Sequence, residues 1–208
     1  MRCTIAISRG TYFLICLYMD MLAMDITELR PWNPPPGDVV HLFCDASGCP
    51  PCLGAVLFCD GAWRWTCMDL LDRDLHLFKP RRDAQIIGLE LLAISLGMCS
   101  FETWLQGRKI IVHCDNKGSE ASIRRGSARS WDHAQLVHAQ WLHAARYQMS
   151  LFIKRVNSKD NIGDLPSRGD FNLMHALGAE WVQPKLWSMF RDQDTWAVLQ
   201  ERWAAAGG

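Results

Sequence analysis

Several features that define special classes of protein are missing from this chain of 208 residues. Lysine and arginine (22) balance aspartate and glutamate (22), so no overall basic charge would hold the protein on nucleic acid or on an anionic membrane. The longest apolar stretch near the start, residues 11–23, contains Asp20 and is shorter than the about 20 residues that a membrane-spanning helix needs. With 49% hydrophobic and 21% charged residues, the composition predicts an ordinary folded domain and no membrane partner.

A disulfide framework is also missing. The nine cysteines are an odd number without even spacing, which favours reduced thiols and an intracellular location, in cytoplasm or nucleus. The Cys-Pro-Pro-Cys segment at 49–52 has the spacing of a redox motif, and with nearby cysteines it could form a zinc cluster. However, residues 53–59 are expected to form a strand rather than the helix a thioredoxin-like site needs, and a second close cysteine pair is lacking.

Both ends of the chain differ from its middle. Residues 1–37 are predicted to form an N-terminal helical extension and a stiff connector, because three consecutive prolines stand at 34–36. Residues 171–208 are predicted to be a C-terminal helical tail, because large apolar residues recur there at roughly helical spacing, namely Trp181, Leu186, Trp187, Phe190, Trp196, Leu199 and Trp203. The remaining segment, 38–170, is the predicted domain.

The pattern within 38–170 predicts a mixed α/β fold. Residues 39–44, 53–59 and 62–68 are predicted to form a strand meander with a turn at Asp60-Gly61, and apolar residues at steps of three and four predict a helix from 83 to about 105. A strand at 109–114, helices at about 116–127 and 131–148 and a last strand at 150–156 follow, before a loop at 157–163. The strand–helix–strand order implies a right-handed crossover and a parallel pair, so we expect a five-stranded mixed sheet flanked by helices.

Four acidic residues are expected at one edge of this sheet. Asp45 and Asp115 each follow an apolar strand, and parallel strands place such ends side by side. Glu90 stands on an apolar helix face, and Asp164 opens the segment after the last strand. Four carboxylates repel one another unless cations bind, and oxygen ligands favour Mg²⁺ or Mn²⁺ over zinc. Each acid also has an ordinary explanation: Asp45 and Asp115 as turn formers, Glu90 as an ion-pair partner of Arg81 or Arg82, and Asp164 as a helix cap. The occurrence of all four acids together favours a divalent-metal site.

The motifs around these acids resemble the ribonuclease H family, in particular the domain that follows reverse transcriptase in retrotransposons. Asp-Ala-Ser at 45–47, followed by the apolar run 53–57, is similar to the family's first strand and hairpin. Residues 88–94 resemble its catalytic helix, His-Cys-Asp-Asn at 113–116 its third motif, and residues 161–168 its fourth. The motifs occur in the family's order and cover residues 39–168.

The resemblance implies hydrolysis of the RNA strand of an RNA/DNA hybrid with two metal ions, Mg²⁺ or Mn²⁺. It implies that Asp45 bridges both ions, that Glu90 and Asp115 hold the ion on the leaving-group side, and that Asp164 holds the ion that activates water. It also implies a reverse-transcriptase domain as a partner in a parent polyprotein. One departure is that residues 157–160 lack the histidine that many members carry before the fourth motif, which predicts slower turnover.

Charge is distributed unevenly along the chain. Residues 105–159 hold ten lysines and arginines against three acids, whereas residues 38–104 are net acidic. Arg124, Arg125 and Arg129 are candidate phosphate contacts, and Asn116 is a candidate for the minor groove, where 2′-hydroxyls mark RNA. A solvated basic face is the alternative. Two other functions remain open, a non-catalytic nucleic-acid- or protein-binding module of the same fold, and another nuclease or integrase of the superfamily.

Overall fold

The computed structural model describes residues 39–75 and 85–186, together with single positions at Ile15, Met19, Phe78 and Met189. The chain divides into two compact units, Met1–Pro36 and Gly37–Gly208. The predicted N-terminal helix and proline connector, apart from Ile15 and Met19, lie outside the described residues, as does the predicted tail beyond 186 apart from Met189. The fold below is that of the described part of the second unit.

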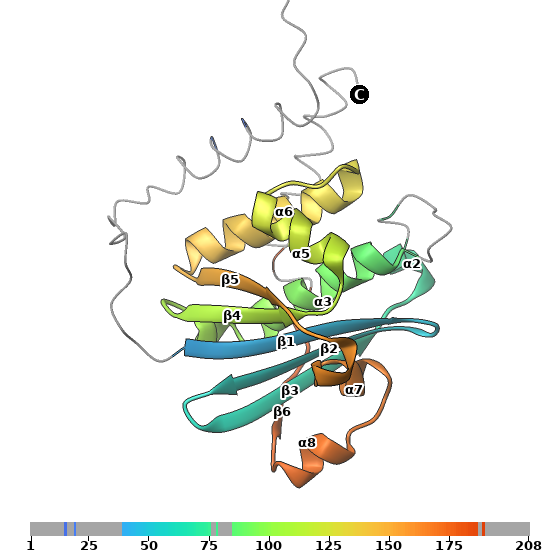
Figure 1. The fold of residues 1–208 in the computed structure, drawn as a ribbon, viewed down its shortest axis with the longest axis vertical. Helices are drawn as coiled ribbons and strands as arrows, with labels where there is room; N and C mark the ends of the chain where they lie inside the picture. The colour runs from blue at the N-terminus through green and yellow to red at the C-terminus, as the bar shows by residue number, and fades with distance from the viewer. Residues whose placement is uncertain are drawn as a thin grey trace, which may run out of the picture. The chain divides into compact units, whose positions relative to one another are not determined.

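A six-stranded mixed sheet forms the centre of this unit (Figure 1). The strand order is β5-β4-β1-β2-β3-β6. Strand β1 is antiparallel to β2, and β2 to β3, whereas β4 lies parallel to β1 and β5 parallel to β4. The predicted meander and the predicted crossover are thus confirmed. The strands are β1 Val39–Gly48, β2 Pro51–Cys59, β3 Ala62–Asp69, β4 Lys109–Cys114, β5 Ser150–Arg155 and β6 Glu180–Trp181.

The prediction of five strands is wrong because the chain returns to the sheet after residue 171. Strand β6 lies parallel to β3, pairing Arg64 with Glu180 and Trp65 with Trp181. The Arg64 Nε also donates to Glu180 Oε2 at 3.1 Å. Trp181 is therefore a strand residue, and the helical spacing that includes it did not predict this pairing with a distant strand.

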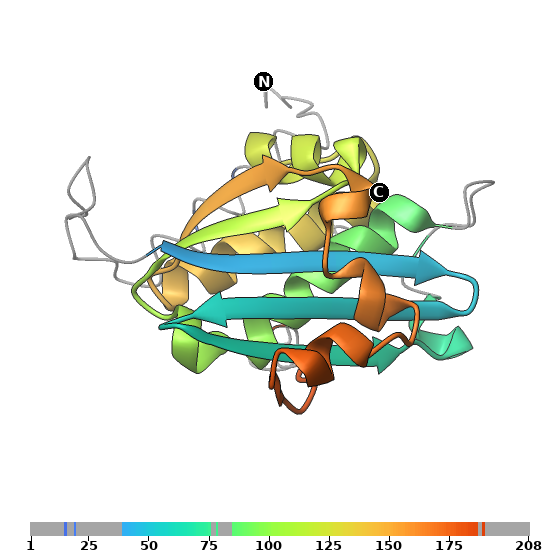
Figure 2. The same cartoon turned by 60° about the horizontal axis from the view of Figure 1, so that its bottom comes forward.

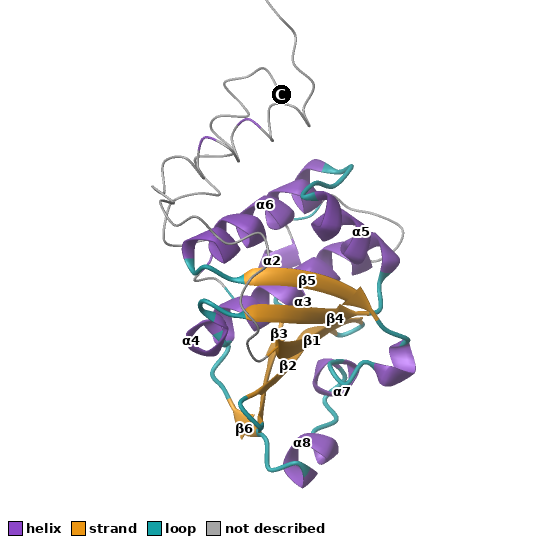
Figure 3. Cartoon of the chain, turned by 60° about the vertical axis from the view of Figure 1, so that its left-hand side comes forward, coloured by secondary structure: helices purple, strands orange, loops and turns teal. Residues whose placement is uncertain are grey.

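Helices cover both faces of the sheet (Figure 3). On one face lie α3 (Ile86–Ser100), α5 (Lys117–Arg125) and α6 (Trp131–Arg146), and on the other lie α7 (Asp164–Ser167) and α8 (Asn172–Ala176). Short segments complete the fold, α2 (Asp72–Leu75), α4 (Glu102–Leu105) and η1 (Ser158–Asp160). The single helix predicted to run to about residue 105 is wrong, because it breaks at Phe101, whose backbone leaves the helical region while its ring is fully buried.

The main core lies between α3 and the centre of the sheet. All of α3 from Gly88 to Ser100 is buried. Gly97 lets this helix approach β1 closely, since a Cβ atom there would stand 2.9 Å from the Leu42 Cδ1 atom and 3.2 Å from the Cys44 sulfur. Each fully buried large apolar side chain contributes about 1.5–3 kcal/mol. This packing fixes the height of α3 over the strand that carries Asp45.

A second, smaller cluster lies on the opposite face of the sheet. Val56, Trp65 and Met174 are its buried members. Elements α7 and α8 cover this part of the sheet, while the half where β1 begins and β2 ends has no described helix in front of it (Figure 2). This uneven cover leaves one part of the face available to solvent.

Candidate metal centre

Asp45 and Asp115 meet at the end of the β1–β4 pair. The parallel register ends at Phe43 opposite His113, and each aspartate follows two residues later along its own segment of the chain. Strand β4 ends at Cys114, so Asp115 begins the loop after it, as predicted. The predicted end of the first strand at Asp45 is wrong, because β1 continues to Gly48 in its antiparallel pairing with β2, where Asp45 faces Gly54.

Glu90 joins the two aspartates from the second turn of α3. Each of the three carboxylates offers an oxygen, and these oxygens all lie within 4.8 Å of one another. Glu90 is only 4% exposed, and its Oε2 atom has no hydrogen-bond partner. We call Asp45, Glu90 and Asp115 the three-acid cluster. Among the described residues it is the one group of this kind that could hold a metal ion.

Burial and mutual repulsion favour protonation in the three-acid cluster. Burial, and then the charges of Asp45 and Asp115, raise the pKa of Glu90 to about 9. The pKa of Asp45 is also raised, first by burial and then by Asp115 and Asp164, while a hydrogen bond from Ser167 opposes the shift. A cation at this position would lower the pKa values of these carboxyl groups, because it stabilises the ionised carboxylates.

Two residues of the fourth motif hold Asp45 in place, and the sequence analysis assigned a role to neither. The Ser167 hydroxyl donates to Asp45 Oδ2 at 2.8 Å. The Asn161 amide donates to the Cys44 carbonyl at 2.9 Å and reaches Asp45 Oδ1 at 3.4 Å. Asn161 is 3% and Ser167 2% exposed. The signal in the sequence that could have indicated this role is that Asn161 and Ser167 lie in the same motif as Asp164.

Two glycines allow the fourth motif to reach the strands. A Cβ atom at Gly54 would stand 2.6 Å from both the Gly163 oxygen and the Ser167 nitrogen. A Cβ atom at Gly163 would stand 3.1 Å from backbone atoms of Phe43 and Cys44. The backbone of 163–167 therefore lies directly on β1 and β2, and only glycine fits at Gly54 without a shift.

Asp164, the fourth predicted acid, is not part of the three-acid cluster. It begins α7, and its carboxylate forms an ion pair with Arg168 at 2.5 Å, with 29% of the Asp164 side chain exposed. Its charge still contributes to the raised pKa values of Asp45 and Glu90. The structure thus brings three of the four predicted ligands together and places the fourth beside them, neutralised by an arginine.

The donor set of the three-acid cluster fits a hard divalent cation. All three side chains offer carboxylate oxygens, which Mg²⁺ and Mn²⁺ prefer. Two neighbouring thiols do not change this, because burial raises the pKa of Cys114 to about 12 and the pKa of Cys44 well above its usual value. Both thiols stay protonated at neutral pH. The Glu90 Oε2 atom makes no hydrogen bond that would compete with a cation for it.

The predicted nucleic-acid contacts lie on and near α5, which follows Asp115. Arg124, Arg125 and Arg129 are exposed, and Arg124 forms an ion pair with Glu120 at 3.1 Å. Asn116 caps α5, its side-chain oxygen accepting from the Gly118 nitrogen at 2.8 Å. Capping uses the oxygen of Asn116, so contact with a nucleic acid remains a prediction for its amide nitrogen.

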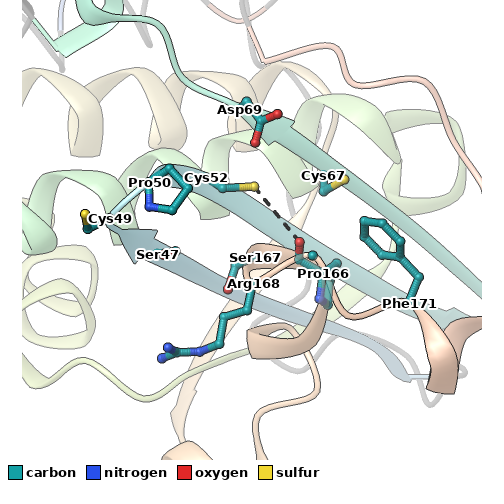
Figure 4. Close-up of a pocket in the computed structure, with 11 residues that line it drawn as sticks. Ser47, Cys49, Pro50, Cys52, Cys67, Asp69, Pro166, Ser167, Arg168 and Phe171 are labelled. Carbon is teal, nitrogen blue, oxygen red and sulfur yellow. Dashed lines mark hydrogen bonds between the residues drawn. The ribbon is translucent and has the colours of Figure 1, made fainter.

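A pocket of about 390 Å³ opens beside Ser167 (Figure 4). Ser47 and Cys52 from the first two strands line it, as do Cys67 from β3 and Arg168. The Cys52 sulfur lies 4.0 Å from the Pro166 oxygen, as the dashed line shows. Strand β2 begins at Pro51, inside the Cys-Pro-Pro-Cys segment and two residues earlier than predicted, so this segment leads into a strand and lacks the helix of a thioredoxin-like site. All seven cysteines of the described part are free thiols.

The chain was compared with protein-family models and with curated proteins. No protein-family model matches the chain, and no curated protein matches it. Among the described residues, no helix has the length and apolar character that crossing a membrane requires.

Proposed function

We propose that this protein is a metal-dependent endonuclease of the ribonuclease H type, which hydrolyses the RNA strand of RNA/DNA hybrids. The observation that carries the proposal is the meeting of Asp45, Glu90 and Asp115, whose carboxylate oxygens lie within 4.8 Å of one another. These residues come from three separate motifs that resemble the family, on strand β1, on helix α3 and at the end of strand β4, in the family's order. The parallel β1–β4 pair and the antiparallel β1–β2 pair agree with the fold that the resemblance implies.

The three-acid cluster would hold Mg²⁺ or Mn²⁺ ions, which activate water and neutralise the leaving oxygen when bound. The chain supplies the orientation of the ligands. Ser167 and Asn161 donate to the two oxygens of Asp45, and α3 holds the buried Glu90 against the strand ends. The ligands are thus fixed by packing and hydrogen bonds before any ion binds, which reduces the reorganisation that binding requires.

Support for a nucleic-acid substrate comes from the basic surface after β4. Arg124, Arg125 and Arg129 are exposed on or near α5, which starts two residues after Asp115. Lysine and arginine side chains near a metal site can hold phosphates on either side of the cleaved bond. The choice of the RNA strand of a hybrid, and a reverse-transcriptase domain as a partner, rest on the family resemblance.

The experiment is a cleavage assay with the purified full chain and an RNA/DNA hybrid, each strand end-labelled in turn, in Mg²⁺, Mn²⁺ or EDTA. We expect metal-dependent cutting of the RNA strand, abolished in Asp115→Asn without loss of folding. The matched control is Asp72→Asn, which removes an exposed aspartate at the start of α2. Competition with duplex DNA and duplex RNA separates a hybrid nuclease from another nuclease of the superfamily. Undiminished cutting by Asp115→Asn would refute the proposal.

A non-catalytic binding module is the second candidate. The observation that favours it is the ion pair of Asp164 with Arg168, which occupies the fourth carboxylate. Binding of the hybrid by a folded protein without cleavage in either metal would favour this candidate.

A further inference from the structure

The sheet face opposite α3 carries a continuous array of aromatic rings that the metal site does not use. In β1, Leu42 and Cys44 point towards α3, so His41 and Phe43 point to the opposite face. The register places Phe58 opposite His41, Trp63 opposite Phe58, and His113 opposite Phe43. Phe152 of β5 lies opposite Ile111, which lies opposite His41. We call His41, Phe43, Phe58, Trp63, His113 and Phe152 the aromatic face.

Five of these rings are in contact. The rings of Phe43 and His113 are stacked with centroids 4.2 Å apart, and His41 stacks on His113 at 5.3 Å. Phe58 and Trp63 lie 4.6 Å apart. These five rings span the four adjacent strands β4, β1, β2 and β3.

Solvent reaches the aromatic face at its β5 side. Phe152 is 64% exposed, the highest value among the large hydrophobic side chains of the described residues. His41, Phe43, Phe58 and Trp63 are partly exposed. In Figure 2 the described helices α7 and α8 lie across the other part of this face and leave the start of β1 uncovered. An aromatic ring in such a position is costly to expose unless it has a partner.

The charged side chains of strands β4 and β5 are positive. The charged residues of β4 and β5 are Lys109, Lys154 and Arg155, and neither strand has an acidic residue. Lys154 is exposed, points to the same face as Phe152, and lies opposite His113. Lys109 is on that face too, two residues before Ile111. Lysine is depleted from the cores of protein–protein interfaces, whereas aromatic rings beside lysines are typical of surfaces that bind single strands.

We propose that the aromatic face binds a single-stranded nucleic acid. Bases stack on Phe152 and on the exposed edges of the neighbouring rings, and phosphates lie near Lys154 and Lys109. The occupant follows from charge complementarity, since Phe152 and Lys154 stand on one face of β5 and Lys109 stands on the same face of β4, so that rings which can stack bases lie beside lysines which can pair with phosphates. The inference does not depend on hydrolysis at the three-acid cluster.

The test measures the binding of the full chain to a fluorescent oligo(dT) of about 16 nucleotides, in EDTA and at several salt concentrations. Phe152→Ala removes the most exposed ring and is expected to weaken binding about 5- to 150-fold while leaving the salt dependence unchanged. Lys154→Ala removes one phosphate contact and is expected to make the slope of log affinity against log salt shallower by about 0.7. The two variants therefore separate stacking from charge.

The matched control is Leu71→Ala, because Leu71 is 52% exposed and lies outside the aromatic face, between β3 and α2. It is expected to bind as the unchanged protein does. No binding by the unchanged protein, or equal affinity in Phe152→Ala, overturns the inference. A change in sedimentation with Phe152→Ala but none in oligonucleotide binding also overturns it, and identifies a second protein chain as the occupant. Hybrid cleavage, measured separately in Mg²⁺, tests only the proposed enzyme.

Discussion

Replacing Glu90 by glutamine should stabilise the metal-free protein and abolish its activity. Glu90 is buried in the three-acid cluster, and burial with two neighbouring aspartates raises its pKa to about 9 from the ordinary value of 4.5. At neutral pH the folded protein must keep this side chain protonated, whereas the unfolded chain ionises it freely. Glutamine has nearly the same shape, carries no charge and can donate to the aspartates, so it removes this cost.

The sign and size follow from proton linkage. Between pH 4.5 and about 9 the folded state binds one more proton at Glu90 than the unfolded state, so stability falls as pH rises, by about 1.4 kcal/mol per pH unit. Near pH 7.5, about 3 units above the unfolded value, the cost reaches about 4 kcal/mol as an upper bound. We expect Glu90→Gln to gain about 2–4 kcal/mol there, or about 5–15 °C in melting temperature.

The assay is thermal and urea unfolding in EDTA at several pH values from 5 to 9, followed by hybrid cleavage in Mg²⁺. The unchanged protein should lose stability as pH rises and regain it when Mg²⁺ is added, whereas Glu90→Gln should have a flatter pH profile, a weaker response to Mg²⁺ and no cleavage. Glu180→Gln, which changes a side chain that is 62% exposed, is the control. A pH profile in Glu90→Gln as steep as in the unchanged protein would refute the reasoning.

Two further predictions concern the contact of the fourth motif with the strands. Ser167→Ala removes the hydroxyl that lowers the pKa of Asp45, so the acidic limb of the plot of cleavage rate against pH should move to higher pH. The free energy of unfolding in urea should fall by about 1.5–3 kcal/mol. An acidic limb at the same pH as in the unchanged protein would contradict this role of Ser167. Gly54→Ala places a Cβ atom 2.6 Å from the Gly163 oxygen, so it should cost about 1–3 kcal/mol and most of the activity. Gly48→Ala, where a Cβ atom meets nothing within 4 Å, is its control, and equal effects of the two would exclude the packing explanation.

Local sequence patterns were sufficient to predict most of the strands and helices of the fold. Asp60 and Gly61 both have positive φ, 54° and 74°, as the Asp-Gly pair predicts for a two-residue hairpin turn. Runs of apolar residues between turn signals located strands β1 to β5, and the helix period located α3. These elements follow from backbone preferences and side-chain periodicity, which depend on neighbours only a few residues apart.

Contacts between distant parts of the chain could not be predicted in the same way. Strand β6 has two residues and exists through its pairing with Arg64 and Trp65, more than a hundred positions earlier. The break at Phe101 follows from the burial of one ring in the core. Neither depends on a local pattern, because the free energy comes from surfaces that meet only after folding.

The candidate site could also be predicted only in part from the sequence. The sequence by itself determined which four acids to consider and that Asp45 and Asp115 would meet, since parallel strands bring their ends together. Only the tertiary structure decided that Asp164 pairs with Arg168 outside the three-acid cluster, and that Ser167 and Asn161 hold Asp45. Those outcomes depend on differences of a few tenths of an ångström in the distances between atoms. The packing of α7 on Gly54 and the strands sets these distances, and they are fixed only when the whole core has formed.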